Sequence, residues 1–331
     1  MRRSFLLLTM LLIGAACGTT DTGGETTTTV DTTTTTGASG TTSTTEAAPT
    51  TTVEAAFPVT VDADNGTVTI EERPESIVSL STVATEIVFA IAAGDQVVAV
   101  DDQSNYPEDA PMTDLSGFTP NIEAILAYEP DLVFISYDPG DLVASLQAAD
   151  VPVISFGAAA TLDDTYRQIE VTGAATGHIE EAIVVNESIQ DDLAKISEEA
   201  PDVPEDTTYF HEIDADLYTV TSSTFFGQIY SMFGLENIAD PADEDGTAFG
   251  YPQISSEFLV AADPDLIFLA DSVYGESAET VAARPGWDVL TAVQEGGVFE
   301  LDSDIASRWG PRIVEFAESI SDALDTYMSQ N

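Results

Sequence analysis

The stretch that decides the fold is EAILAYEPDLVF, residues 123–134, and a second version of it, EFLVAADPDLIF, occupies residues 257–268. Each version starts with a glutamate and continues, after six residues, with Pro-Asp-Leu and two apolar residues. A short helix that ends before a proline and leads into a buried strand accounts for this pattern. Such a unit is common, and the helix dipole by itself favours a glutamate in the first turn. Because the spacing is identical in both versions, the repeat favours two lobes of one architecture.

Strands and helices alternate on both sides of the first version. Residues 59–70 form two alternating runs around Asn65-Gly66, which predicts a hairpin. Strands are then predicted over 76–80, 96–100, 131–136 and 151–156, and helices over 83–93, 121–128 and 142–149. This alternation indicates a largely parallel, doubly wound sheet that is covered by helices on both faces.

The middle of the chain, residues 161–200, has helical periodicity and no strand signal. Residues 179–200 predict one long amphipathic helix that stops at Pro201. A second set follows, with strands expected over 207–213, 218–221, 265–269 and 298–301 and helices over 225–233, 256–262 and 311–327. The predicted fold is therefore α/β, with two doubly wound lobes, 57–160 and 206–331, joined by a helical linker, 161–205, that contains a single long helix.

Residues 1–17 have the proportions of a bacterial lipoprotein signal peptide. Two arginines precede an uncharged apolar run that is too short to span a membrane. Gly14-Ala15-Ala16 stands before Cys17, the only cysteine and the predicted site of lipidation, although such signals prefer leucine at position 14. A plain secretory signal cleaved nearby is the alternative, and both interpretations predict an exported protein. Residues 18–56 are rich in threonine and nearly free of large apolar side chains, which predicts a disordered tether.

The chain is strongly acidic. Its 331 residues include 8 Lys+Arg and 59 Asp+Glu, which gives a net charge of −51. A surface of this charge repels phosphate groups, so nucleic acid is excluded as a partner, and the charge also argues against electrostatic docking on anionic lipid. The acidity itself is consistent with a solubility adaptation, for instance to salt.

Several short motifs follow one another between residues 57 and 328. They are RPESIVSLS (73–81), TEIVFA (85–90), SNYP (104–107), NIE (121–123), YPQ (251–253) and SRWGPR (307–312). In this order they resemble the periplasmic binding proteins for iron–siderophore complexes and vitamin B12, which are the substrate-binding components of ABC importers. The resemblance implies two α/β lobes bridged by one helix, the helical-hinge type of periplasmic binding protein, with a small-molecule metal chelate held in the cleft between the lobes.

The resemblance also implies partners and a location. The expected protein is a monomer, anchored by its lipid on the outer face of the cytoplasmic membrane, at the cell surface or in the periplasm. It would serve an ABC permease dimer of the iron-complex/B12 type and its ATPase. Members of this family dock onto arginines of the two permease subunits through one acidic residue on each lobe, and by motif position these residues are Glu123 and Glu257. The alternative is that both glutamates only stabilise the starts of their helices.

Ligand contacts are expected at the carboxyl ends of the strands, where doubly wound sheets bind ligands. The candidates are Ser81, Thr82, Tyr106, Phe118 and Tyr137 in the first lobe and Glu212, Tyr218, Tyr251, Arg308 and Trp309 in the second. Aromatic side chains at loop ends suit a large, partly apolar ligand, and ordinary packing is their alternative. Arg308 lies where the family often places a ligand-contacting arginine and would suit an anionic group; a structural ion pair is the alternative. Glu212 is expected either to bond a ligand donor or to be paired internally.

The first expectation for the ligand is a ferric siderophore, the second a B12-type corrinoid and the third haem. Tyr218 and Tyr251 suit stacking on hydroxamate or catecholate groups without excluding a macrocycle. A bare metal ion is disfavoured, because receptors for free metals need several imidazoles or thiolates and the chain has only His178 and His211. No resident cofactor and no direct metal ligand is expected.

Two other classes of function are distinguishable from a transport receptor. The sequence contains no Gly-x-Ser-x-Gly, P-loop, Gly-x-Gly-x-x-Gly or His-Glu-x-x-His motif, so the chain is not expected to be an enzyme. An exported hydrolase would lose activity when a histidine is replaced. A tethered sensor or adhesin would keep the binding fold but would tolerate replacement of Glu123 and Glu257 without any effect on uptake.

Overall fold

The computed structural model describes residues 56–331. The predicted signal peptide, Cys17 and the predicted tether up to residue 55 lie outside the described residues. The described chain begins with an antiparallel hairpin, β1 (Val59–Ala63) and β2 (Gly66–Ile70), in which Ala63 pairs with Gly66. The hairpin predicted around Asn65-Gly66 is therefore confirmed, and its β1 strand packs on helix α4 (Leu162–Thr176).

The first lobe is built on a five-stranded parallel sheet in the order β5-β4-β3-β6-β7. Its strands are β3 (Ile77–Leu80), β4 (Val97–Asp101), β5 (Met112–Leu115), β6 (Leu132–Ile135) and β7 (Val153–Ser155). Every residue of β3 and β6 is buried, because successive side chains enter two different cores. Leu132 and Phe134 pack on the side of helix α1 (Thr82–Ala90), and Val133 and Ile135 pack on the side of α2 (Ile122–Leu126) and α3 (Leu142–Gln147).

The second lobe repeats this plan with a four-stranded parallel sheet in the order β11-β10-β8-β9. Its strands are β8 (Thr208–Glu212), β9 (Glu236–Asn237), β10 (Leu266–Leu269) and β11 (Val298–Glu300). Phe268 packs in the core that contains residues of α6 (Phe225–Met232) and α10 (Ile313–Gln330). Ile267 and Leu269 pack in a second core under α7 (Ser256–Ala262), α8 (Ala278–Ala282) and α9 (Thr291–Gln294).

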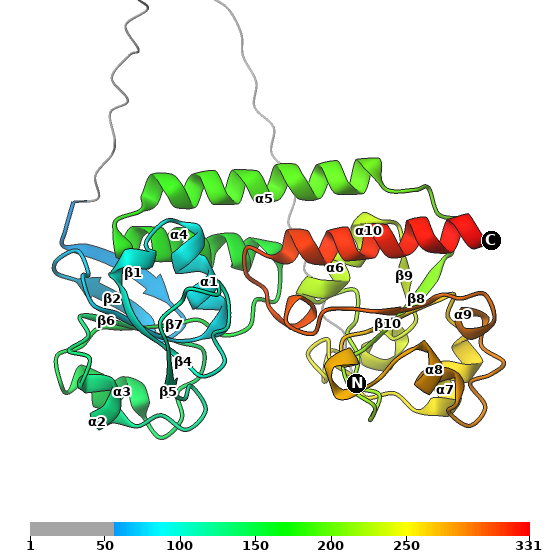
Figure 1. Cartoon of the computed structure of the whole chain (residues 1–331), viewed down its shortest axis with the longest axis horizontal. Coiled ribbons are helices and arrows are strands. Elements are labelled where there is room, and N and C mark those ends of the chain that lie inside the picture. The colour runs from blue at the N-terminus through cyan, green and yellow to red at the C-terminus, as the bar shows by residue number, and fades with distance from the viewer. Residues whose placement is uncertain (1–55) are drawn as a thin grey trace, which may run out of the picture. The chain divides into compact units, whose positions relative to one another are not determined.

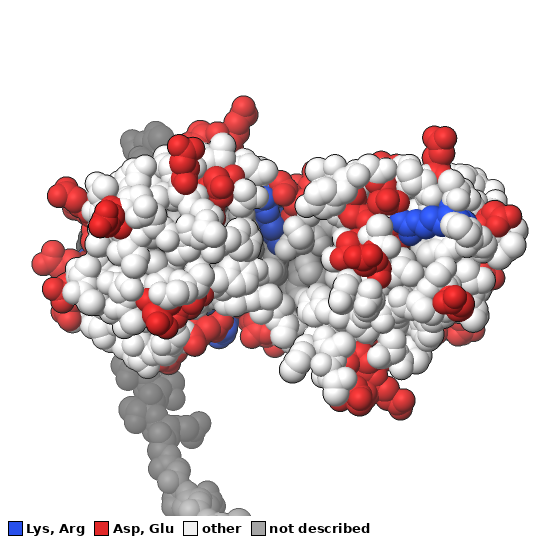
Figure 2. All heavy atoms as spheres, turned by 90° about the horizontal axis from the view of Figure 1, so that it is seen from below, with Lys and Arg blue, Asp and Glu red and all other residues white. Residues whose placement is uncertain are grey.

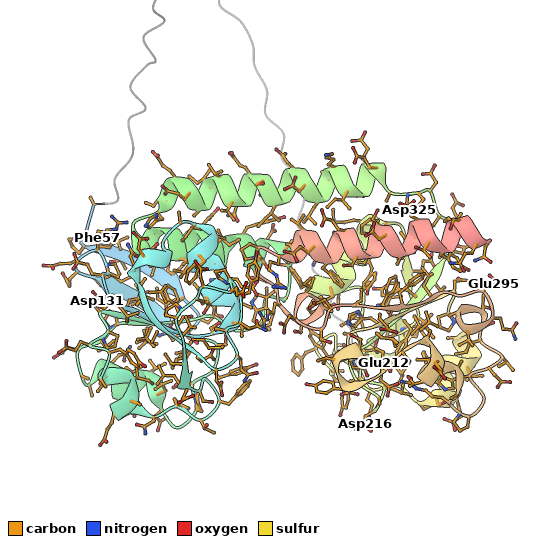
Figure 3. The ribbon with its side chains drawn as sticks, in the orientation of Figure 1. Phe57, Asp131, Glu212, Asp216, Glu295 and Asp325 are labelled. Carbon is orange, nitrogen blue, oxygen red and sulfur yellow. The ribbon has the colours of Figure 1, made fainter. Side chains whose placement is uncertain are left out.

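The repeated Pro-Asp has the same structural task in both lobes. The Asp131 carboxylate accepts hydrogen bonds from the backbone N–H groups of Glu75 (2.8 Å) and Ser76 (3.1 Å), just before β3 (Figure 3). The Asp265 carboxylate accepts one from the N–H of Thr208 (2.8 Å), at the start of β8. Each aspartate thus joins the start of one strand to the start of its neighbour. The Pro-Asp repeat is explained because the carboxylate provides a hydrogen-bond acceptor for backbone N–H groups at these strand starts.

Two helices connect the sheets. Helix α4 packs on α1 and β1, and helix α5 (Ile179–Glu199) packs on α4 and on α10, so α5 touches elements of both lobes. Figure 1 shows α5 running above both sheets, with α2 and α7 at the opposite side of the molecule. The chain reverses between α4 and α5 at Gly177, whose φ of 81° belongs to the left-handed region that glycine adopts without strain.

The structure confirms the predicted fold class and corrects one strand. Residues 218–221 do not form a strand; Tyr218 makes only an isolated bridge with Gln253. Four elements carried no usable sequence signal: the edge strands β5 and β9 and the short helices α8 and α9. Among the described residues, no helix is long and apolar enough to cross a membrane.

Candidate ligand-binding cleft

The strand order reverses at one point in each sheet, between β3 and β6 in the first lobe and between β8 and β10 in the second. Loops that leave a parallel sheet on either side of such a point diverge and leave a crevice at the carboxyl ends of the strands. In the first lobe these loops start with Ser81 and Ser136, whose hydroxyl groups are joined by a 2.7 Å hydrogen bond. Figure 2, seen from the side opposite α5, shows a furrow between the two lobes.

The smaller of two cavities in this furrow, of about 240 Å³, lies at the reversal point of the first lobe. Its wall includes six of the predicted contacts: Ser81, Thr82, Phe118, Tyr137, Arg308 and Trp309. The rings of Phe118 and Tyr137 lie 5.5 Å apart, and the two residues are 63% and 56% exposed. Because these rings are not used by the core, they form an aromatic surface that is available to a ligand.

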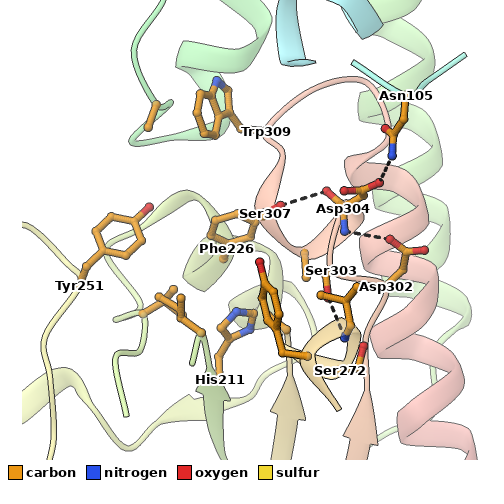
Figure 4. A pocket seen from close by; sticks show the side chains of 17 residues that line it. Asn105, His211, Phe226, Tyr251, Ser272, Asp302, Ser303, Asp304, Ser307 and Trp309 are labelled. Atoms are coloured by element: carbon orange, nitrogen blue, oxygen red, sulfur yellow. Dashed lines mark hydrogen bonds between the residues drawn. The ribbon is translucent and has the colours of Figure 1, made fainter. Parts of the chain in front are cut away.

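The larger cavity, of about 820 Å³, takes residues from both lobes (Figure 4). Asn105 and Ala158 come from the first lobe, and His211, Tyr251 and Trp309 lie opposite them. A volume of this size accommodates a large organic ligand. Trp309 lines both cavities, and its indole N–H donates to Gln168 of α4 (3.1 Å), which fixes the ring between the lobes.

His211 forms part of the floor of the larger cavity and is neutral near pH 7. It is 1% exposed, and its Nδ1 lies 2.9 Å from the hydroxyl of Tyr230. Burial lowers the pKa of the imidazole to about 3, because the charged form would lose its hydration. The larger cavity therefore receives no positive charge from its histidine.

Arg308 differs from the expectation of a free cation for an anionic ligand. Its guanidinium bonds the carboxylate of Glu86 on α1 (2.8 Å) and that of Asp304 (2.9 Å), and only 8% of its side chain is exposed. Arg308 does line the smaller cavity, but two carboxylates already compensate its charge. The structural ion pair, which was the alternative, describes this residue.

Glu212 is also corrected, because its side chain is completely buried in an ion pair and lines neither cavity; Figure 3 labels its position in the second lobe. Both of its oxygens accept from Arg284, at 2.6 Å and 2.5 Å, and Arg284 also bonds Glu276 at 2.7 Å. Burial nevertheless raises the pKa of Glu212 to about 6. The residue holds the second lobe together and does not face a ligand.

Two predicted tyrosines lie elsewhere. Tyr106 is stacked under Arg312, 4.3 Å from the guanidinium carbon to the ring centre, in a groove formed with α1, α5 and α10. Tyr218 is 42% exposed, pairs with Gln253 and lines neither cavity. Both predictions relied on closeness to a strand end in sequence, and the intervening loops carry these side chains past the cleft.

The segment between β11 and α10 contributes several cleft residues that were not predicted from the sequence. It supplies Asp302, Ser303, Asp304 and Ser307, and the loop after β10 adds Val273 and Tyr274. Asn105 donates to Asp304 across the lobes (2.7 Å), as Figure 4 shows. The available signal was their position directly after predicted strands, which is where the rule for doubly wound sheets places ligand contacts.

Glu123 and Glu257 occupy equivalent, exposed positions in the first turns of α2 and α7. The preceding residues, Asn121 and Ser255, cap the two helices by accepting from the N–H groups of Ala124 (3.1 Å) and Phe258 (3.1 Å). The pKa of Glu257 is lowered by its own backbone N–H and by the Ser255 hydroxyl. The side chains therefore stand as a matched pair of carboxylates on the side of the molecule away from α5.

Comparison with known families decides the classification. The model of a family described as "Periplasmic binding protein" matches residues 77–305, which include both sheets and most residues of the cleft. The chain belongs to the periplasmic binding protein family. This family consists of solute-binding transport components, so the chain is a substrate-binding receptor of an ABC importer and acts outside the cytoplasm.

Individual relatives of this periplasmic binding protein agree with the assignment. It is 32% identical to the uncharacterized ABC transporter substrate-binding lipoprotein YvrC of Bacillus subtilis, over 82% of this chain and 87% of the relative. It is 31% identical to a cobalamin-binding protein of Halobacterium salinarum, over 78% and 72%. Among solved structures, the periplasmic vitamin B12 binding protein BtuF of Vibrio cholerae superposes with a TM-score of 0.61 at 26% identity, over 77% and 98%.

Proposed function

We propose that this receptor binds a B12-type corrinoid in the cleft between its lobes and delivers it to an ABC permease. The observation that carries the proposal is the charge of the cleft. Among the described residues that line the two cavities, Arg308 is the only Lys or Arg, and it is paired, whereas Asp101, Asp302 and Asp304 are carboxylates. A neutral macrocycle rich in amides fits aromatic walls with polar acceptors better than an anion does.

The negative charge of the cleft also decides the order of the other candidate ligands. Tris-catecholate iron complexes and haem with its propionates carry net negative charge, and the cleft offers them no free cation. Ferric hydroxamates are neutral or cationic, so they remain the second candidate and keep the sequence-based expectation of a siderophore open. The names of the relatives from H. salinarum and V. cholerae support the corrinoid as the first candidate.

The ligand class is tested by thermal shift and native mass spectrometry of the purified protein. The panel holds cyanocobalamin, a ferric hydroxamate, a ferric catecholate, ferric citrate and haem, each at low and at high salt. We expect stabilisation that grows with cyanocobalamin concentration, as for any ligand that binds only the folded state. Stabilisation by the catecholate or haem instead would contradict the charge argument.

We further propose that Glu123 and Glu257 dock the loaded receptor onto the permease. Both carboxylates are exposed, occur at the same position of the repeated unit, and lie one on each lobe. Contacts between such carboxylates and arginines of the partner are charge-assisted and fix the register of an interface. A contact on each lobe also lets the permease pull the lobes apart and release the ligand.

Docking is tested by uptake of labelled cobalamin in cells that carry the double variant Glu123→Lys/Glu257→Lys. Uptake should fall at least tenfold while ligand affinity stays unchanged, because the altered side chains lie outside both cavities. The matched control Glu187→Lys/Asp325→Lys makes the same change of charge at exposed sites on α5 and α10. Normal uptake by the first double variant would favour the tethered sensor.

The remaining proposals concern the membrane anchor, which lies outside the described residues, the oligomeric state and nucleic acid. We propose that Cys17 is lipidated, that residues 18–56 tether a monomeric receptor to the outer face of the cytoplasmic membrane, and that no nucleic acid is bound. The variant Cys17→Ala should move the protein from the membrane fraction to the soluble fraction. A membrane-bound Cys17→Ala variant would contradict lipid anchoring at this residue.

A further inference from the structure

A third hollow lies outside the two cavities of the cleft. This groove, of about 530 Å³, is formed by α1, α5, α10 and the loop that carries Tyr106 and Pro107, so its walls belong to both lobes and to the helix that connects them. Its apolar lining consists of Phe89, Ala90, Val185, Ile189, Pro311 and Val314. None of its lining residues takes part in the larger or the smaller cavity of the cleft.

The charged residues of the groove are unbalanced. Glu86, Asp192, Glu315 and Glu318 supply four carboxylates, and Arg312 is the only described Lys or Arg in the lining. The guanidinium of Arg312 already lies over the ring of Tyr106, at 4.3 Å, and 3.7 Å from Glu315. An apolar groove with excess carboxylates attracts a molecule that combines an apolar body with a positive charge.

Glu86 gives independent support, because one of its oxygens lacks a partner. The residue is 2% exposed, and Oε1 accepts from Arg308 at 2.8 Å. Oε2 is buried and has no hydrogen bond within the described structure. Nε of Arg312, which also has no hydrogen bond there, lies 3.9 Å from it. A buried carboxylate oxygen without a donor costs free energy, which an incoming donor recovers.

We propose that this groove is a second binding site that takes a small alkyl- or arylalkylamine and is coupled to the cleft through Glu86. The apolar body lies against Phe89, Val185 and Val314, and the ammonium group lies among the carboxylates. Glu86 is shared, since its other oxygen holds Arg308, which lines the smaller cavity of the cleft. An amine that donates to Oε2 weakens the hold of Glu86 on Arg308 and therefore changes the position of Arg308 and of its neighbour Trp309.

The site is tested with phenethylamine as the probe and 2-phenylethanol as its uncharged counterpart, by calorimetry at physiological salt. This arm needs no cleft ligand, so it is independent of the proposed function. We expect one saturable site for the amine and at least tenfold weaker binding of the alcohol. Equal affinity for the two probes, or amine binding that does not saturate, would overturn the proposal.

The location is tested with variants on α5. Ser188 is exposed and lines the groove, whereas Gln190 is exposed on the same helix and outside the lining. We expect Ser188→Phe to weaken phenethylamine binding at least tenfold and Gln190→Phe to leave it within twofold. Glu315→Gln/Glu318→Gln, which keeps the buried Glu86 pair, should also weaken the amine. Unchanged affinity in Ser188→Phe would place the amine elsewhere and overturn the site.

The coupling is tested by tryptophan emission, because Trp309 lies beside Arg308 and the chain has only two tryptophans. Saturating phenethylamine should shift the emission of the wild type and not that of Ser188→Phe. An amine that binds at the groove without changing the emission would contradict the coupling while leaving the site intact.

Discussion

His211 is a buried imidazole whose titration affects stability. Its pKa is about 3 in the folded protein, against about 6.5 when exposed. The folded state disfavours the charged imidazole. The contribution of His211 to the unfolding free energy is therefore complete above pH 6.5 and is lost progressively as the pH falls from 6.5 towards 3. Glu212 acts in the opposite direction: its pKa of about 6 is raised, so stability is gained as the pH falls from 7 through 6.

The two effects are separated by the variant His211→Asn, which keeps a polar group near Tyr230. Between pH 7 and pH 5.5 the wild type should lose about 1 kcal/mol of unfolding free energy relative to the variant. Urea unfolding at several pH values measures the difference, in which the Glu212 contribution cancels. Parallel pH profiles for the two proteins would show that His211 is not held neutral by burial.

Arg284 compensates the charge of Glu212, whose side chain is more deeply buried than that of Arg284. Glu212 is fully buried, so Arg284→Met leaves an ionised carboxylate without its partner and should cost about 3–5 kcal/mol. Arg167→Met is the control, because its pair with Asp64 (3.2 Å) has both side chains over 40% exposed and is worth about 0–1 kcal/mol. Similar losses in the two variants, by urea unfolding, would contradict the buried-pair account.

At the scale of the elements, α6 depends on a close approach of its first turn to the preceding loop. A Cβ at Gly227 would lie 2.1 Å from the carbonyl oxygen of Thr221, and this loop carries Val220 into the larger cavity. Gly227→Ala should therefore lower the unfolding free energy by about 1–3 kcal/mol, although alanine is the better helix former. Ser231→Ala on the same helix should change it by about 0.5 kcal/mol or less. A stabilised Gly227→Ala variant would show that the loop at Thr221 moves to make room for the methyl group.

The strands show which parts of the fold could be predicted from the sequence. β3 and β6 were predicted because both faces of each strand are buried, so that their residues form short, largely apolar runs. β5 was not, since only Leu115 of its four residues is buried and no run marks an edge strand. Phe118, Tyr137, Tyr251 and Trp309, which the strand-end rule singled out, line the cavities of the cleft, and their contact with a ligand stays a prediction. Arg308 also lines the cleft, but its partner Glu86 and the partner of Glu212, Arg284, were not predicted, because a sequence does not reveal which carboxylate or arginine across the fold compensates a charge.

At the scale of the whole molecule, the lobes are joined twice. Besides α5, the segment before α10 is pinned to the first lobe: Thr165 donates to the carbonyl oxygen of Trp309 (3.0 Å), and Asn105 donates to Asp304 (2.7 Å). Two connections allow less rotation than one flexible crossing. We expect cyanocobalamin to change the radius of gyration in solution X-ray scattering by about 1 Å or less. A larger decrease would require these contacts to break on closure.

The central claim, that a corrinoid binds between the lobes, is tested most directly by calorimetric titration of cyanocobalamin into three proteins. They are the wild type, Ser307→Phe and Ser329→Phe. Ser307 is exposed and lines both cavities of the cleft, whereas Ser329 is exposed near the end of α10, outside them. We expect one site in the wild type, at least tenfold weaker binding in Ser307→Phe and unchanged binding in Ser329→Phe. Equal affinity in all three proteins, or no binding to the wild type, would contradict the central claim.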